Sequence, residues 1–160
     1  MPSDLEVRLR RLEDIEAIRA LKMRYCDLCD RGYDADSLMP LFTEDAVWDG
    51  GMFGRYEGAR RIRRFFEATG GIVRFARHYV TNSVIDVDGD RASGRWYLLQ
   101  AATMPGRDGE RAIWGAARYD ERYLRAAEGW KFESIVLEWD FWTPHDEGWA
   151  KLRFWQEERQ

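Results

Sequence analysis

The sequence predicts an α+β domain in which three helices pack on one face of a curved antiparallel sheet. Up to residue 71, apolar residues recur mainly at steps of three and four, which is the helical period. From residue 77 onward, apolar and polar residues alternate, as is typical of strands. Because the helices precede the strands, we expect a meander covered by helices on one side. A chain of 160 residues is enough for one domain with its own core.

The first helix is expected to begin at a capping box, because Ser3 is followed three residues later by Glu6. Apolar residues then recur at steps of three and four: Leu5, Leu9, Leu12, Ile15, Ile18, Leu21, Tyr25 and Leu28. This spacing predicts a buried stripe on one long helix, or on two helices in series that break near Asp14. Gly32 is the expected end, since glycine accepts the left-handed backbone that terminates helices.

A short second helix is expected over residues 34–42, with Asp34 or Asp36 as its cap. Pro40 would interrupt or end this helix, because proline lacks the backbone N–H that a helix interior needs. The apolar residues at 46–48 then predict a short strand.

Residues 50–58 contain too many glycines for regular structure, and they predict a turn or a flap. A third helix is expected over residues 59–69, with Gly70 and Gly71 as its stop. The arginines near its start are expected to lie on its solvated face.

Four long strands fill most of the remaining chain: residues 77–87, 91–104, 111–125 and 130–142. A tight turn at residues 88–90 joins the first two, and the segments at 105–109 and 126–129 join the others. Pro144 ends the last strand. In the tail from Asp146, three large apolar residues at three-residue spacing are compatible with a final helix: Trp149, Leu152 and Trp155.

Alternation predicts which side chains face inward. In the last strand the inner set is Ile135, Leu137, Trp139 and Phe141. In the strand before it the inner set is Gly115, Ala117 and Tyr119, and small residues beside a tyrosine leave room for a pocket. The strand at 91–104 is ambiguous, because a one-residue shift exchanges its two faces. Its alternatives are Trp96, Leu98 and Gln100 against Arg95, Tyr97 and Leu99.

Composition excludes several classes of function. With 29 acidic and 25 basic residues the net charge is -4, which gives no electrostatic case for nucleic acid. No apolar run reaches the roughly 18 residues that span a bilayer, and no basic-then-apolar leader is present, so we expect a soluble cytoplasmic protein. The eight tryptophans suit a cavity lined by rings.

His78 and Asp30 are the residues best suited to acid–base chemistry. His78 opens a strand, and a neutral imidazole is the usual general base near pH 7, especially with a carboxylate on its far nitrogen. Asp30 lies just before the glycine that ends the first helix. From the pattern alone, a half-exposed strand histidine and a solvated aspartate remain alternatives, and Asp27 competes with Asp30 for the inward position.

Other reactive side chains point more weakly to function. Tyr25 could donate a hydrogen bond to substrate, although its periodicity alone favours a core aromatic. Cys26 and Cys29 have the C-x-x-C spacing but lie near a helix C-terminus, so they are expected to pack as small apolar groups and to form no disulfide framework. No metal site is expected, because no histidine spacing supports the nearby acids Glu44, Asp45 and Asp49.

Several segments resemble, in order, the SnoaL-like branch of the nuclear transport factor 2-like superfamily: residues 14–18, 21–25, 30–32, 41–48, 94–98, 119–123, 129–132 and 141–144. The resemblance covers about residues 5–144 and implies one domain over residues 1–160, with residues 145–160 as a tail. It also implies the family's cone, a bent antiparallel sheet wrapped around helices with a deep pocket at its open end.

Within that branch the chain looks most like bile-acid 7α-dehydratase, scytalone dehydratase and hexachlorocyclohexane dehydrochlorinase. The resemblance implies an Asp–His dyad at Asp30 and His78, with Tyr25 on the tyrosine that precedes the aspartate, and it implies no metal or organic cofactor. Two departures put the substrate in doubt. Ile135 stands where the dehydrochlorinase has an arginine, and Gln100 stands where an acid is expected in the bile-acid enzymes.

The resemblance therefore implies a lyase that removes water or halide from a hydrophobic cyclic molecule. His78 would act as base, Asp30 would orient it, and Tyr25, with Tyr119 or Gln100, would help the leaving group depart. The expected apolar walls are Trp48, Leu98, Trp139 and Phe141. An isomerase on the same dyad is one alternative. A non-catalytic binding or assembly module is another, with the tail and the outer sheet face forming a dimer or trimer contact.

Overall fold

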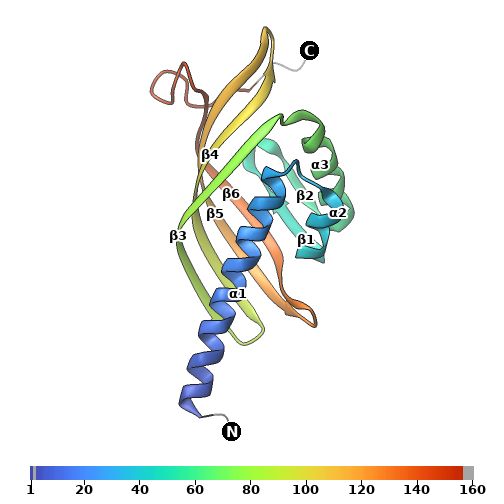
Figure 1. Ribbon diagram of the computed structural model, residues 1–160, viewed down its shortest axis with the longest axis vertical. Helices are drawn as coiled ribbons and strands as arrows, with labels where there is room; N and C mark the ends of the chain where they lie inside the picture. Colours follow the sequence, from blue (N-terminus) through green and yellow to red (C-terminus); the bar gives the residue numbers. More distant parts are fainter. Residues whose placement is uncertain (2, 157–160) are drawn as a thin grey trace.

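The computed structural model describes residue 1 and residues 3–156, and Figure 1 shows one long helix and two short ones on the inner face of a bent sheet. The helices are α1 (Asp4–Asp30), α2 (Ala35–Leu38) and α3 (Ala59–Ile72), with 3-10 turns η1 (Met39–Leu41) and η2 (Gly51–Phe53). The strands are β1 (Phe42–Asp49), β2 (Arg55–Glu57), β3 (Phe75–Asp88), β4 (Arg91–Gly106), β5 (Gly109–Ala126) and β6 (Gly129–Pro144). The predicted α+β class is confirmed.

The six strands form a single curved and unclosed sheet in the order β2-β1-β6-β5-β4-β3. The predicted antiparallel meander is confirmed for β3 to β6. The sheet as a whole is mixed, however, because β1 pairs in parallel with β6 and carries β2 on its other edge. A strand read from periodicity gives no direction for a partner far along the chain, so the parallel pair was not predicted.

The two ends of α1 form as the sequence predicts. Ser3 and Glu6 make the reciprocal bonds of a capping box, and the helix runs without a break through Asp14. Gly32 adopts a left-handed backbone with φ of 105°. The backbone N–H of Tyr33 then donates to the carbonyl of Leu28 at 3.1 Å, which closes the helix C-terminus.

The N-terminal turns of α1, up to Glu13, are exposed, contrary to the predicted buried stripe. The side chains of Leu5, Leu9 and Leu12 are 71%, 53% and 61% exposed, whereas Ile18 is fully buried. Figure 1 shows the reason, because the N-terminal turns of the helix extend beyond the ends of the strands.

Between α1 and α3 the predicted elements shift in extent. Asp34 caps α2 as expected, but Pro40 lies in the 3-10 turn η1, and strand β1 begins at Phe42. The glycine-rich segment over residues 50–58 contains the turn η2 and the strand β2, so it is more regular than predicted.

The predicted stop of α3 at Gly70 is wrong, because the helix continues to Ile72. A Cβ atom at Gly70 would lie 2.6 Å from the carbonyl oxygen of Gly32. Glycine at this position therefore permits a close helix contact with the turn that follows α1, whereas a Cβ at Gly71 would meet no atom within 4 Å.

The long strands are confirmed and extend further than expected, so the loop between β4 and β5 is a tight turn. Burial shows which side chains of β4 face inward. Trp96, Leu98 and Gln100 are buried and form the inner face, whereas Tyr97 and Leu99 are about half exposed. The expected helix in the tail is absent from residues 145–156, which form turns and a single bridge between Phe154 and Trp142.

Candidate active site

Asp30 and His78 form a direct contact at the end of α1. Asp30 is the last residue of the helix, and its Oδ1 lies 2.6 Å from Nδ1 of His78 on β3. The same carboxylate accepts the backbone N–H of His78 at 3.0 Å. Both side chains are nearly covered, at 7% and 6% exposed. Asp27, the competing acid, is 53% exposed and pairs with Arg31, so Asp30 is the inward acid.

The contact determines which nitrogen of His78 is available. With Nδ1–H donated to Asp30, the lone pair of the neutral ring lies on Nε2. No hydrogen-bond partner of Nε2 is found among residues 3–156. Arg77 adds a longer contact of 3.5 Å to the other oxygen of Asp30. The pair can therefore accept a proton at Nε2 while Asp30 stabilises the imidazolium.

Two rows of inner side chains run across the sheet from the dyad. One row joins His78, Gln100, Gly115 and Trp142 on β3 to β6, and the next joins Val80, Leu98, Ala117 and Trp139. A Cβ at Gly115 would lie 2.6 Å from Trp142 and 2.8 Å from Trp139. The inner face of β5 has small residues as predicted, but the space at Gly115 is filled by two indole rings, whereas the sequence predicted room for a pocket there.

The predicted inner position of Phe141 is wrong. A bulge in β6 pairs Ala116 with Phe141 but Ala117 with Trp139, so the alternation changes phase at Asp140. Phe141 consequently lies on the outer face, where it stacks on Trp149 at 4.7 Å. Trp142 takes the inner position and packs against Phe53 and Trp139. Nothing in the alternation signals this bulge.

The structure places Tyr25 of α1 in the core together with Trp48 and Tyr119. The indole N–H of Trp48 donates to the hydroxyl of Tyr25 at 3.0 Å, and phenylalanine rings surround that tyrosine: Phe42, Phe66 and Phe132. Burial raises the pKa of Tyr25 and of Tyr119 well above the usual tyrosine value. Within the described residues, neither hydroxyl is bonded to Asp30 or His78.

Tyr33 was not among the predicted site residues, although it lies against the dyad. Its ring is perpendicular to that of His78 at 6.3 Å and stacks on Phe66. Burial raises the pKa of the Tyr33 phenol well above the usual tyrosine value. The available sequence signal was an aromatic residue directly after the helix-ending glycine.

A buried charged network also escaped the sequence analysis. Lys22 pairs with Glu121, both side chains are fully buried, and the Lys22 ammonium lies 3.2 Å above the ring of Tyr119. Glu121 also accepts the hydroxyl of Tyr123, which in turn accepts the indole N–H of Trp96. A lysine one residue after Leu21, on the apolar side of the helix, was the signal for this network.

A surface hollow is lined by neither Asp30 nor His78. It has a volume of about 870 Å³ and is bounded by β6, the η2 turn and tail residues that include Phe154. Within residues 3–156, no cluster of three or more histidine, cysteine or acidic side chains is arranged to hold a metal ion. The helices of the described chain lack a stretch long and apolar enough for a membrane crossing.

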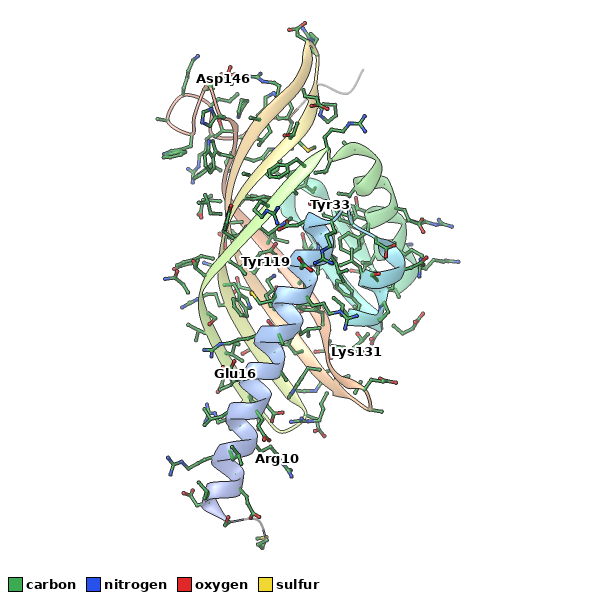
Figure 2. All side chains as sticks on the ribbon, in the orientation of Figure 1. Arg10, Glu16, Tyr33, Tyr119, Lys131 and Asp146 are labelled. Carbon is green, nitrogen blue, oxygen red and sulfur yellow. The ribbon has the colours of Figure 1, made fainter. Side chains whose placement is uncertain are left out.

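Figure 2 labels Tyr33 at the C-terminal end of α1 and Tyr119 further down, beside the same helix. The inner surface of the cone therefore has two polar regions. One, at the end of α1, contains Asp30 and His78 with Gln100 and Tyr33 beside them. The other, further down the helix, contains Lys22 and its partners.

Comparison with known proteins identifies the family. A family model described as a SnoaL-like domain matches residues 10–136. The chain is similar to the crystal structure of a candidate aromatic ring hydroxylase from Novosphingobium aromaticivorans, at 31% identity over 83% of this chain and 94% of that chain, with a TM-score of 0.75. No curated protein matches the chain.

Two further solved structures share the fold at lower identity. A hexachlorocyclohexane dehydrochlorinase of type 3 from Novosphingobium barchaimii is 24% identical over 86% of this chain and 93% of that chain, with a TM-score of 0.74. A candidate scytalone dehydratase from Novosphingobium aromaticivorans is 21% identical over 84% and 89%, with a TM-score of 0.73. The family match, the 31% identical relative and the shared cone agree, and the chain belongs to the SnoaL-like domain family of the nuclear transport factor 2-like superfamily.

Proposed function

We propose that this protein is a cofactor-independent lyase that eliminates water or halide from a hydrophobic cyclic molecule. The observation that carries the proposal is the 2.6 Å contact between Asp30 and His78, which leaves Nε2 of the imidazole free to accept a proton. Two structures of similar fold are described as a hexachlorocyclohexane dehydrochlorinase and a candidate scytalone dehydratase, which supports this reaction class.

In the proposed reaction, Nε2 of His78 removes a proton from a carbon next to the leaving group or next to a carbonyl. Asp30 holds the ring in the productive tautomer and stabilises the imidazolium that forms. The electron pair of the broken C–H bond forms the new double bond, and the hydroxide or halide leaves. For water loss, His78 returns its proton to the departing hydroxide.

The surroundings of His78 favour an apolar substrate. Leu98 and Trp139 lie in the neighbouring inner row, and Trp142 lies in the row of His78, on the far side of Gly115 from Gln100. A bound ring would therefore meet mostly aliphatic and aromatic groups. Since the His78 side chain is only 6% exposed, the substrate must displace side chains that cover it. A site closed to water strengthens each hydrogen bond to the reacting groups.

A substrate screen tests the proposal. Cyclic β-hydroxy ketones and halogenated cyclohexanes would be incubated with the protein, and loss of water or halide would be followed by mass spectrometry and ion analysis. Replacing His78 by Ala is expected to lower the rate at least ~10²-fold. The matched control is His145→Ala, because the other histidine contacts Trp114 outside the inner rows. Undiminished turnover by His78→Ala would exclude His78 as the base.

The same screen distinguishes an isomerase from a lyase. An isomerase on the Asp30–His78 pair would return the proton to a different carbon, so the product would keep the mass of the substrate. A lyase product is lighter by one water or one hydrogen halide.

A binding or assembly role is the second candidate, and the outer sheet face favours it. Tyr79, Leu99, Ala116 and Phe141 form one row across β3 to β6 on that face, and Tyr79 and Leu99 are about half exposed. The 31% identical relative is described as a candidate aromatic ring hydroxylase. We expect a homo-oligomer through this row, and Leu99→Lys should lower the mass measured by light scattering. An unchanged monomeric mass in both proteins would contradict this contact.

A further inference from the structure

Three leucines at the start of α1 lie on a different face of the helix from its core residues. Leu5, Leu9 and Leu12 recur at steps of four and three, so they share one side of the helix, and we refer to them as the leucine stripe. With about 100° of rotation per residue, Leu9 lies about 180° around the helix from Ile18, which is fully buried in the core. The leucine stripe therefore points away from the sheet, and a longer sheet would not cover it.

The leucine stripe is exposed and is confined to the projecting turns of α1. All three side chains are more than half exposed, and Figure 1 shows that these turns extend beyond the ends of the strands. The same face continues with Glu16 and Arg19, so it becomes polar where the buried residues of α1 begin, at Asp14. An apolar stripe outside the core of its own chain is typical of a surface that another chain covers.

Local contacts favour the helix over the turns that carry the leucine stripe. Ser3 and Glu6 form the capping box, and Asp4 pairs with Arg8 one turn later at 3.7 Å. The stripe can therefore be presented as one face of a helix without support from the sheet.

The charges on the two sides of the leucine stripe are opposite. Arg8 lies about 70° from the middle of the stripe on one side, and Glu13 lies about 70° from it on the other. Glu6 adds a second acid beside Glu13. A membrane surface would favour basic residues on both sides of an apolar stripe, so the acidic side argues against a lipid partner.

This asymmetry matches a second copy of the same helix in parallel. Two parallel helices place the basic side of one against the acidic side of the other, and Arg8 then meets Glu13 of the second copy, five residues further along. Two antiparallel helices would bring the two acidic sides together, with Glu6 beside Glu13 of the second copy. The parallel arrangement is therefore the one with complementary charges.

We propose that the leucine stripe is a self-association surface that pairs in parallel with the leucine stripe of a second copy. Leu5, Leu9 and Leu12 each pack against their counterparts. Each sheet lies behind its own helix, and Met23, which continues the same face, is 44% exposed, so the described chain leaves this side of α1 open. Both dyads lie at the same end of the pair, because each is at the C-terminal end of α1.

The contact is weak and depends on protein concentration. Only three leucines of each copy are covered, which is less than a standard protein interface requires. In dilute solution the projecting turns are therefore exposed, and the outer sheet face is a separate contact on a different element.

Cysteine cross-linking tests the pairing directly. In a parallel pair Leu9 meets its own counterpart, so Leu9→Cys should form a disulfide-linked dimer under mild oxidation with copper phenanthroline. Val7→Cys is the matched control, because Val7 is 53% exposed, as Leu9 is, and lies about 160° around the helix from it. We expect Leu9→Cys to cross-link at least ~10-fold faster, since pairing raises the effective concentration of the two thiols. The native cysteines, Cys26 and Cys29, are buried and do not compete.

Sedimentation velocity measures the same contact without a cross-link. The Leu99→Lys variant serves as background, because it removes the contact expected through the outer sheet face. In that background Arg8→Glu should weaken self-association about 10-fold at low salt, because two ion pairs are lost and like charges meet. Adding Glu13→Arg to Arg8→Glu should restore the association.

Three outcomes would overturn the proposal. The first is equal cross-linking by Leu9→Cys and Val7→Cys, and the second is a monomer at every concentration in the Leu99→Lys background. The third is faster cross-linking between Leu5→Cys and Leu12→Cys than of either variant with itself, which would show an antiparallel pair. A thermal melt of each variant checks that the fold is retained.

Discussion

At the scale of single residues, the position of Asp30 is the best-determined feature of the candidate site. Its carboxylate accepts both the ring and the backbone N–H of His78. We expect Asp30→Asn to lower the rate at least ~10²-fold, because an amide cannot stabilise the imidazolium as a carboxylate does. Asp27→Asn is the control, since Asp27 is exposed three residues earlier on the same helix. Equal rates for Asp30→Asn and wild type would remove Asp30 from the mechanism.

The Lys22–Glu121 pair yields a stability prediction. Both side chains are fully buried, so Lys22→Met leaves an unpaired buried carboxylate and should destabilise the protein by about 3–5 kcal/mol. The double replacement Lys22→Met with Glu121→Leu should recover most of that loss, because two apolar side chains need no partner. Urea unfolding of the three variants measures both effects. A double variant no more stable than Lys22→Met would show that the network contributes more than charge pairing.

Residue patterns gave part of the site and missed the rest for identifiable reasons. Asp30 and His78 were found because one follows from a helix end and both follow from the family resemblance. Tyr33 was missed because helical periodicity stops at Gly32, and no pattern reports where the next side chain turns. The sequence suggested Tyr25 as a hydrogen-bond donor to substrate, but its helical spacing fits a core aromatic equally well. In the structure Tyr25 lies in the core, where its hydroxyl accepts the indole N–H of Trp48.

At the scale of elements, the glycine pair in α3 offers a matched experiment. Gly70→Ala places a Cβ 2.6 Å from the Gly32 carbonyl, so we expect a loss of about 1–3 kcal/mol in unfolding free energy. Gly71→Ala meets no atom within 4 Å and lies in the same helix, so it should stabilise by roughly 0.5–1 kcal/mol. Thermal melts measure the two effects. Equal shifts for both variants would contradict the close contact at Gly70.

The strands show how far alternation can be trusted. It assigned the inner faces of β5 and most of β6 correctly, because a one-sided buried sheet enforces the period of two. It failed after Asp140, where one extra residue changes the phase, and it gave no direction for β1. Bulges and long-range pairing depend on neighbouring strands, which a local pattern does not contain.

At the scale of the whole molecule, one ion pair ties the long helix to the far end of the sheet. Arg125 at the end of β5 holds both oxygens of Asp14, at 2.7 and 2.8 Å, and also bonds to Asp90 in the β3–β4 turn. The indole N–H of Trp130 adds a third donor to Asp14. This cluster fixes α1 against two hairpins at the end opposite the dyad.

The same cluster predicts a pH dependence. The hydrogen bonds from Arg125 hold the pKa of Asp14 below its ordinary value, so its contribution to stability is fully present above the unfolded pKa of about 3.9. That contribution is lost as the pH falls through the lower folded pKa. We expect Asp14→Asn to be destabilised near pH 7 and to approach the stability of the wild type as the pH falls through the lowered folded pKa of Asp14. Urea unfolding across pH measures this, with Glu13→Gln as an exposed control. A difference independent of pH would contradict it.

The uneven burial of α1 has a consequence for the motion of the chain. Its hydrogen bonds are continuous from Asp4 to Asp30, but its buried residues begin only at Asp14. An unpacked helical segment of two or three turns is marginal in water. Amide hydrogens around Leu9 should therefore exchange with solvent by local fraying, whereas those around Cys26 should exchange only when the whole domain unfolds. Hydrogen exchange along this one helix would then give two different free energies, one for local fraying of its N-terminal turns and one for unfolding of the whole domain.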